Sequence, residues 1–443
     1  MKKLAFSLFA ASSLFAMGAT PKYEGLAKAE EVRARQGIGN VLKKIRAGEE
    51  VVVAYLGGSI TAMNGWRNMT TEWLRETYPG AKFKEVHAAI GGTGSGLGVF
   101  RVGWDALRHD PDLLFIEFAT NDSAAAPENI WKNMEGIVRQ TWKKDPTTDI
   151  VFTYTITGSM KNEYLAGNCN RAASAMEMLA DHYGIPSVNF GPRVAALLAA
   201  DKLVMGDKDI ETAVPKQDPE YDRKIKELRA NDKRILFAND SVHPRKEGHL
   251  LYRASITNAF TQMKDTWKKP SNHAAKLARP FVENNMENAK MVDITPDMLS
   301  GSWEKLPATD PQMKRFSNRM GQIWRATTPG DTLKFKFKGT ACYIYDLLGP
   351  DAGQVWITVD GEKRKKPAAR FDSYCTYHRI SSLYIFAGKD GEHTVEITVD
   401  KDQPSRQSVA FRLKDPAKEL AGEKYQGTKF WASKIQLVGD LVK

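Results

Sequence analysis

Short apolar runs alternate with amphipathic stretches from Glu49 to about Phe260, and this alternation most constrains what the chain can fold into. The runs are continuous and rich in β-branched and aromatic residues, as in strands that are buried on both faces. They cover Val51–Leu56, Leu113–Phe118 and Ile150–Tyr154. Helices are predicted between them over Trp66–Tyr78, Asn129–Trp142 and Asn170–Tyr183. Strands alternating with helices predict an α/β fold, with a doubly wound parallel sheet between two helical layers in a flavodoxin-like arrangement.

A different pattern begins after about Met291. The segment "TLKFKFKG" alternates Leu333, Phe335 and Phe337 with lysines, and further short strand-like runs follow it. Such alternation is typical of antiparallel strands, so this part is predicted to be an all-β, jelly-roll-like sandwich. The 443 residues also exceed what one core usually holds, about 250–300 residues. We expect an α/β domain over residues 20–270, a linker over 271–295 and the sandwich over 296–443. Charged residues 201–234 are expected to form a surface excursion.

The first residues, "MKKLAFSLFAASSLFAMGAT", have the three parts of a secretory signal. Lys2 and Lys3 precede an apolar stretch of about 14 residues, which is too short to span a bilayer. Small residues follow it, as a signal peptidase requires. We expect residues 1–19 to be a signal peptide, and the mature chain to be periplasmic or extracellular with no membrane-spanning segment.

Charge and cysteine content limit the partners. The formal net charge of +11 favours acidic partners such as an acidic polysaccharide, whereas export argues against nucleic acid. Three cysteines are too few for a disulfide scaffold, although Cys342 and Cys375 both fall in the second half of the chain and could pair in an oxidising compartment. Cys169 is expected to be a packing residue. The histidines show no metal-ligand spacing, so no metal site is predicted.

Two glycine-rich segments follow apolar runs. "AYLGGSITAMNG" places Ser59 directly after the first predicted strand, where ligands bind in open α/β sheets. A helix that begins there favours negative charge near the serine. "HAAIGGTGSGLG" (87–98) matches no nucleotide-binding glycine motif. It is either a turn or a loop whose backbone N–H groups face a ligand.

Two further segments carry polar side chains in suitable positions. In "FATND", Asn121 and Asp122 follow the next buried strand, and the Asn121 amide is placed to stabilise an oxyanion unless the pair only caps a helix. In "DSVHP", Asp240 and His243 are three residues apart, so the carboxylate can orient the imidazole toward a serine. His249 has no such carboxylate and is expected to be buried.

Taken together and in this order, the four segments resemble the blocks of the SGNH (GDSL-like) hydrolase superfamily. The resemblance covers about Glu49 to Phe260 and implies that Ser59 is the nucleophile, with Asp240 and His243 completing a triad. It also implies an oxyanion hole built from Ser59, Gly92 and Asn121, with Gly91 as an alternative to Gly92.

The chain departs from the family pattern at two positions. Gly58 stands where the family usually has Asp, as in a subgroup with a Gly-Gly-Ser-Ile-Thr first block, and His87 opens the second block in place of Asn. An α/β-hydrolase would also place Ser, Asp and His in this order. It would need Gly-x-Ser-x-Gly, whereas position 61 is Thr.

The function predicted from these features is serine ester hydrolysis without a metal or organic cofactor, most simply the removal of O-acetyl groups from a polysaccharide or glycan, with acidic glycans included. A lipolytic esterase or lysophospholipase, an O-acetyltransferase, and a glycan-binding module with an inactive hydrolase domain remain alternatives. Aromatic residues of the second half are candidates for stacking on sugars or for core packing: Trp324, Trp356, Tyr374, Tyr377 and Trp431.

Overall fold

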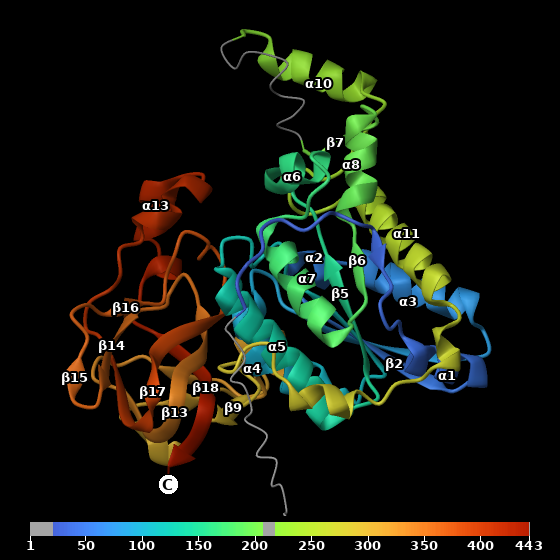
Figure 1. Ribbon diagram of the computed structural model, residues 1–443. Helices are drawn as coiled ribbons and strands as arrows, with labels where there is room; N and C mark the ends of the chain where they lie inside the picture. The colour runs from blue at the N-terminus through green and yellow to red at the C-terminus, as the bar shows by residue number, and fades with distance from the viewer. Residues whose placement is uncertain (1–20, 207–217, 443) are drawn as a thin grey trace, which may run out of the picture.

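The computed structural model describes residues 21–206 and 218–442, which form an α/β domain followed by an antiparallel β domain (Figure 1). The predicted signal segment 1–19 lies outside the described residues. Within the two described ranges, no helix combines the length and apolar character needed to cross a membrane.

A parallel sheet forms the centre of the α/β domain. In the described part of the chain its strands run in the order β1-β6-β5-β4-β2-β3, with the short β1 (Val32–Arg33) antiparallel at one edge. The parallel strands are β2 (Glu50–Gly57), β3 (Lys82–Ala89), β4 (Leu113–Glu117), β5 (Asp149–Tyr154) and β6 (Ser187–Asn189). This flavodoxin-like order confirms the predicted doubly wound sheet. Because β3 lies on one side of β2 and β4 on the other, the chain changes direction at the end of β2, where such folds bind ligands.

Helices cover both faces of this sheet because side chains of β2 alternate between two cores. Ala54 and Leu56 pack under α4 (Ser95–Asp105), α5 (Pro127–Lys144) and α7 (Arg171–Tyr183). Val53 and Tyr55 pack on the other face under α1 (Gly39–Ala47), α3 (Trp66–Thr77) and α11 (Lys246–Met263). The predicted strands and helices are therefore present. The edge strand β3 was not predicted, because its residues alternate between exposed and buried.

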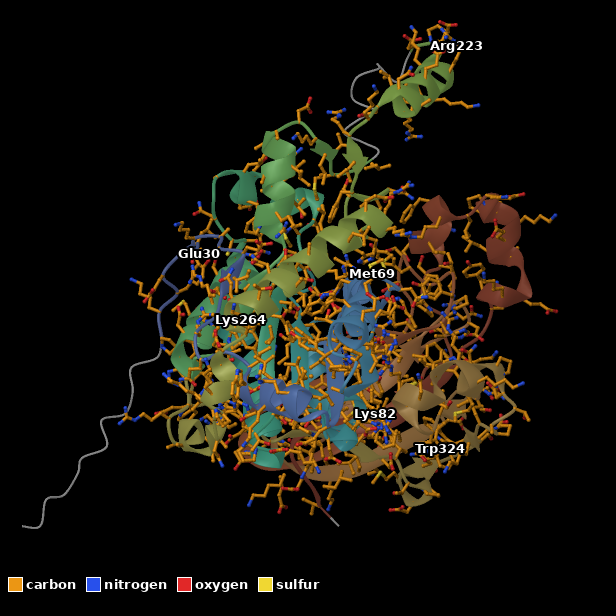
Figure 2. The ribbon with its side chains drawn as sticks, turned by 90° about the vertical axis from the view of Figure 1, so that its right-hand side faces the viewer. Glu30, Met69, Lys82, Arg223, Lys264 and Trp324 are labelled. Atoms are coloured by element: carbon orange, nitrogen blue, oxygen red, sulfur yellow. The ribbon has the colours of Figure 1, made fainter. Side chains whose placement is uncertain are left out.

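Within the charged segment 201–234, the described residues divide between the body of the domain and an outlying helix. β7 (Leu203–Val204) pairs with β8 (Ile235–Leu236), and α10 (Tyr221–Asn231) extends away from the sheet (Figure 1). Arg223 lies on this outlying helix (Figure 2) and pairs there with Glu220 and Glu227. Residues 207–217 of the expected excursion, including Pro215, lie outside the described residues. Two short helices, α6 (Lys161–Leu165) and α8 (Gly191–Ala199), lie near its base (Figure 1).

The named strands of the second domain pair in an antiparallel manner, as predicted. Its longest strands are β13 (Thr332–Leu348), β17 (Arg379–Val399) and β18 (Phe430–Val442), joined to the shorter strands β9 (Ala289–Asp293), β10 (Leu299–Ser300), β11 (Glu304–Lys305), β12 (Trp324–Ala326), β14 (Gln354–Val359), β15 (Glu362–Lys363) and β16 (Ala368–Ala369). In β13, Leu333, Phe335 and Phe337 are buried while the intervening lysines are exposed. Pairing links these ten strands of the described C-terminal region into one sheet, and the jelly-roll topology stays a prediction.

The region expected to be a linker is packed between the domains. Within residues 271–295, Phe281 lies edge-on to Trp131 of α5, and β9 pairs with β18 of the C-terminal sheet. On the other side of the junction, α12 (Pro311–Met320) approaches the end of β3. Ile90 and Leu97 of the α/β domain pack against the apolar face of this helix and its neighbours.

Cys342 and Cys375 do not form the disulfide that their shared location in the second half of the chain allowed. Both thiols are buried and free, and they lie in different hydrophobic clusters of the second domain. Cys169 is also a buried free thiol, in agreement with its predicted packing role.

Candidate active site

Ser59 lies at the carboxyl end of β2, as the first residue of the short helix α2 (Ser59–Ala62). The hydroxyl oxygen Oγ of Ser59 is 2.8 Å from Nε2 of His243, which comes from the loop before α11. These two residues are 184 positions apart in the sequence. The structure therefore brings the first and last predicted blocks together at hydrogen-bond distance.

Asp240 completes a hydrogen-bonded chain. Its Oδ2 is 2.7 Å from Nδ1 of His243, and its Oδ1 accepts the backbone N–H groups of Val242 and His243 at 3.0 and 2.8 Å. Burial opposes the charged carboxylate, but these hydrogen bonds outweigh it and hold the pKa of Asp240 below its ordinary value. Asp240 therefore stays ionised and fixes the His243 ring with Nε2 toward the serine.

Two glycines fit closely around the loop that carries this pair. Ser241 has a left-handed backbone, with a φ of 64°, and its carbonyl accepts the Gly158 N–H at 2.7 Å. A Cβ atom on Gly158 would lie 2.9 Å from the Ser241 Cβ, and one on Gly206 would lie 2.0 Å from its Oγ. The close approach of Gly158 and Gly206 thus supports the loop.

The glycine turn after β3 lies beside Ser59. Ile90 donates its N–H to the Gly57 carbonyl at 3.0 Å, which ties the ends of β3 and β2 together. A Cβ on Gly91 would lie 3.6 Å from the Ser59 Cβ, so Gly91 lies beside the serine. Gly92 has a φ of 72°, which only glycine adopts easily, and the space next to its Cα is open. The turn is thus placed next to the nucleophile, and the choice between the Gly91 and Gly92 N–H groups as oxyanion donor stays a prediction.

Asn121 explains the departure from Gly-Asp-Ser. A Cβ at position 58 would lie 1.9 Å from Oδ1 of Asn121 and 2.8 Å from its Cγ. Any side chain there must displace the amide, so Gly58 allows Asn121 to reach the residue before Ser59. The structure therefore places Ser59, the Gly91–Gly92 turn, Asn121, Asp240 and His243 at one edge of the sheet.

Asp122 caps a helix, which is the structural role that the Asn-Asp pair allowed. Its carboxylate accepts the Ser95 N–H at the start of α4 at 3.0 Å. The side chain is buried, and desolvation raises the pKa of Asp122 to about 6 in spite of that hydrogen bond.

We expect Asp122→Asn to change how stability depends on pH. Between about pH 4 and 6 folded Asp122 holds a proton that the unfolded chain has lost, so the free energy of unfolding falls as pH rises through this range. Asparagine still accepts the Ser95 N–H but does not titrate. The free energy of unfolding of the variant should therefore fall by about 3 kcal/mol less than that of the parent over this pH range. Urea unfolding at pH 4, 5, 6 and 7 measures it. Exposed Asp402→Asn is the control, and parallel curves for Asp122→Asn and the parent would contradict the prediction.

Three charged residues behind the site, two of them buried and one half-buried, were not predicted from the sequence. Glu117, at the end of β4, accepts hydrogen bonds from Thr61 of α2 at 2.9 Å and Thr155 at 2.7 Å, and burial raises its pKa. Arg101 of α4 donates to the carbonyls of Gly57 and Ala88 and to Thr93, so it joins the ends of β2 and β3.

Arg319 is the third of these residues and comes from α12 of the second domain. It donates to the carbonyls of His87 and Ala89 at 2.6 and 3.1 Å, and its Nη1 lies 3.7 Å from the Asp105 carboxylate. The second domain therefore contacts the strand that leads into the glycine turn. Only the apolar run before Glu117 hinted at any of the three, because their partners lie far away in the sequence.

The remaining candidates divide between core and surface. Trp324 and Trp431 are buried in the second domain, whereas Tyr374 and Tyr377 are exposed. Trp356 lies on the outer face of β14, with the Lys363 ammonium 4.0 Å from its ring centre. His249 is buried as predicted, and its Nδ1 accepts the Trp66 N–H at 3.2 Å. Across residues 21–206 and 218–442, no group of three or more His, Cys, Asp or Glu side chains is arranged to hold a metal ion.

Comparison with known proteins agrees with this arrangement. Residues 55–251, which include Ser59, Asn121, Asp240 and His243, match the model of the GDSL-like Lipase/Acylhydrolase family. No curated protein matches the chain.

Two solved structures share both domains. They are crystal structures of a two-domain esterase (CEX) active on acetylated mannans, one of them co-crystallized with mannopentaose. Both are 20% identical to this chain, with TM-scores of 0.65 and 0.66, and the match covers 95% of this chain and 98% or 99% of theirs. At this identity the likeness shows a shared two-domain fold. The family match over residues 55–251 confirms the resemblance inferred from the four sequence blocks: this part of the chain is similar to the GDSL-like Lipase/Acylhydrolase family.

Proposed function

We propose that this protein is an exported serine esterase that removes O-acetyl groups from a polysaccharide. The observation that carries the proposal is the chain of hydrogen bonds from Asp240 to His243 to Ser59, at 2.7 and 2.8 Å, at the carboxyl edge of the parallel sheet. Nucleophile, base and orienting carboxylate in this geometry are the requirements for acyl transfer through a covalent intermediate.

In the proposed reaction, Ser59 Oγ attacks the carbonyl carbon of an acetyl ester while His243 Nε2 takes its proton. The ionised Asp240 stabilises the imidazolium that forms. Negative charge develops on the carbonyl oxygen, where the backbone N–H of Ser59, an N–H of the Gly91–Gly92 turn and the Asn121 amide are placed to donate. His243 then protonates the leaving sugar hydroxyl. A water molecule, deprotonated by His243, releases acetate and restores Ser59.

Three observations support an acetylated polysaccharide as substrate. The His243 and Asp240 side chains are 38% and 55% exposed, so the site is open enough for a polymer to reach it. The solved structures that share the two-domain fold belong to an esterase active on acetylated mannans. The signal-like N-terminal sequence supports export to where polysaccharides occur.

A substrate panel tests the proposal. We expect release of acetate from p-nitrophenyl acetate and from acetylated glucomannan or xylan, with rates on p-nitrophenyl octanoate at least about tenfold lower. Preference for octanoate would favour a lipolytic esterase. Acetyl transfer to added sugar acceptors in preference to water would favour a transferase. Absence of turnover on every ester, in a folded protein that still binds glycan, would favour a binding module.

A further inference from the structure

A wide groove lies between the two domains and borders the candidate active site at Asn121. It has a volume of about 1570 Å³ and is lined by residues of α4 and α5 on one side, by residues of β13, β17 and β18 on the other, and by residues 284–290. We call it the interdomain groove. Asn121 and Asp122 line it, and Asn121 lies against Gly58, the residue before Ser59. Ser59, Asp240 and His243 do not line the groove themselves, so a chain lying in it would pass beside the Asn121 side of the candidate active site.

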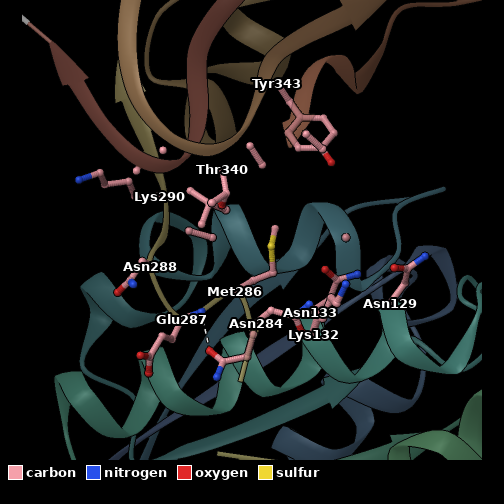
Figure 3. Close-up of a pocket in the computed structure, with 18 of the residues that line it drawn as sticks. Asn129, Lys132, Asn133, Asn284, Met286, Glu287, Asn288, Lys290, Thr340 and Tyr343 are labelled. Carbon is pink, nitrogen blue, oxygen red and sulfur yellow. Dashed lines mark hydrogen bonds between the residues drawn. The ribbon is translucent and has the colours of Figure 1, made fainter. Parts of the chain in front are cut away.

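The groove is lined by amide side chains that have no partner of their own. Asn129 and Asn133 of α5 and Asn284 point into it, facing Thr340 and Tyr343 of the second domain (Figure 3). Within the described residues, the side chains of these three asparagines form no hydrogen bond, and the Lys132 ammonium beside them has no carboxylate partner. An amide presents both donors and acceptors, which suits sugar hydroxyl groups.

An aromatic ring faces these amides across the groove. Tyr343 is half-buried, and its ring is held by contacts with Phe100 of the α/β domain at 5.4 Å and Tyr384 at 5.6 Å between ring centres. A fixed ring opposite a row of free amides gives one apolar and one polar wall, the combination that small-molecule sites use to bind and orient a ligand. The volume exceeds the range of about 300–1,000 Å³ for such sites, which indicates an occupant of several units.

The charges of the groove are balanced, although the whole chain carries +11. Its described lining includes three lysines and four acidic residues. Lys290 pairs with Asp440, and Glu287 pairs with Arg139 and Lys143 at 2.5 and 3.0 Å. The charged side chains of the lining that are left after this pairing have no excess of positive charge. An acidic polymer would therefore gain little electrostatic attraction in the groove.

We propose that the interdomain groove binds the backbone of an uncharged polysaccharide on one side of the acetylated residue, so that the second domain forms one wall of the substrate site. This inference rests on the proposed esterase function, but binding of a polysaccharide to the groove can be measured without catalysis. It replaces the acidic glycan allowed by the net charge with a neutral one.

The test is binding of oligosaccharides without acetyl groups to a Ser59→Ala chain, measured by titration calorimetry with mannohexaose, xylohexaose and hexagalacturonate. We expect at least one neutral hexasaccharide to bind more tightly than hexagalacturonate. Adding Asn129→Ala and Asn133→Ala should weaken that binding about tenfold or more, since each lost hydrogen bond contributes to affinity. The matched control is Asn231→Ala, an exposed amide on α10, far from the groove.

A second readout uses chains in which Ser59 is intact. In the Asn129→Ala/Asn133→Ala variant, the ratio of kcat/KM on the acetylated polymer to kcat/KM on p-nitrophenyl acetate should fall about tenfold, because the small ester cannot span the groove. Tighter binding of hexagalacturonate, or affinity unchanged by the double substitution, would overturn the groove proposal. Absence of p-nitrophenyl acetate turnover in the parent, with oligosaccharide binding retained, would instead overturn the esterase proposal alone.

Discussion

Ser59→Ala is expected to lower kcat on p-nitrophenyl acetate and on acetylated polysaccharide by about 10⁴- to 10⁶-fold, because no covalent intermediate can form. The residual rate would come from oxyanion donors and from binding, which this substitution leaves in place. Substrate affinity and the unfolding midpoint should change little, since only one hydroxyl is removed. Initial rates with a chromogenic ester, together with urea unfolding, measure both quantities.

Ser123→Ala is the matched control for this prediction. Ser123 is an exposed serine close in sequence to Asn121. Arg171 donates a hydrogen bond to its backbone carbonyl and not to its hydroxyl. The Ser123→Ala chain should hydrolyse the chromogenic ester at the rate of the parent. A Ser59→Ala chain that keeps a tenth or more of the parent rate would show that another group is the nucleophile.

Gly58→Asp gives this chain the Gly-Asp-Ser sequence that is usual in the family. We expect this substitution to lower the catalytic rate strongly rather than raise it. The new Cβ would lie 1.9 Å from the Asn121 amide oxygen, far inside van der Waals contact. Either Asn121 or the backbone that carries Ser59 must move. Loss of one oxyanion donor lowers the rate by about 10²- to 10³-fold, and displacement of the serine adds to this loss. We expect kcat to decrease about 10³-fold. Overpacking should also lower the free energy of unfolding by about 1–3 kcal/mol.

Two further variants distinguish the steric clash between a side chain at position 58 and the Asn121 amide from other effects of the substitution. Gly58→Ala should also be destabilised, and Asn121→Ala in the same chain should restore stability without restoring the rate, because it removes the obstacle together with the donor. Gly80→Ala is the control, since a Cβ at Gly80 meets no atom within 4 Å. Parent-like activity in Gly58→Asp would refute the placement of Asn121 against Gly58.

The sequence was sufficient to predict the parts of this molecule that depend on local pattern. The buried runs 51–56, 113–118 and 150–154 correspond to β2, β4 and β5, because strands covered on both faces must be continuously apolar. The polar residues after these strands meet at one edge because parallel strands share their carboxyl ends. The order of the blocks then placed Ser59, Asn121, Asp240 and His243 together, although the sequence does not contain their distances.

Features that depend on distant residues could not be predicted in this way. The edge strand β3 lacks a continuous apolar run, since one of its faces is partly exposed. Arg101 and Arg319 look like surface arginines in the sequence, yet they hold the ends of β2 and β3. The interdomain groove exists only because residues 284–290 and the C-terminal sheet pack beside α5, which no single segment encodes. The steric need for Gly58 likewise depends on Asn121, 63 positions later in the sequence.

The most direct test of the central claim is to identify the atom that carries the acyl group. The parent chain is mixed with p-nitrophenyl acetate, quenched in acid within milliseconds, digested and examined by mass spectrometry. We predict a single acetyl group on the peptide that contains Ser59, and its increased lifetime in a His243→Ala chain whose residual acylation is driven by excess ester. Acetyl found on another residue, or turnover with no acetylated peptide in either chain, would contradict the account.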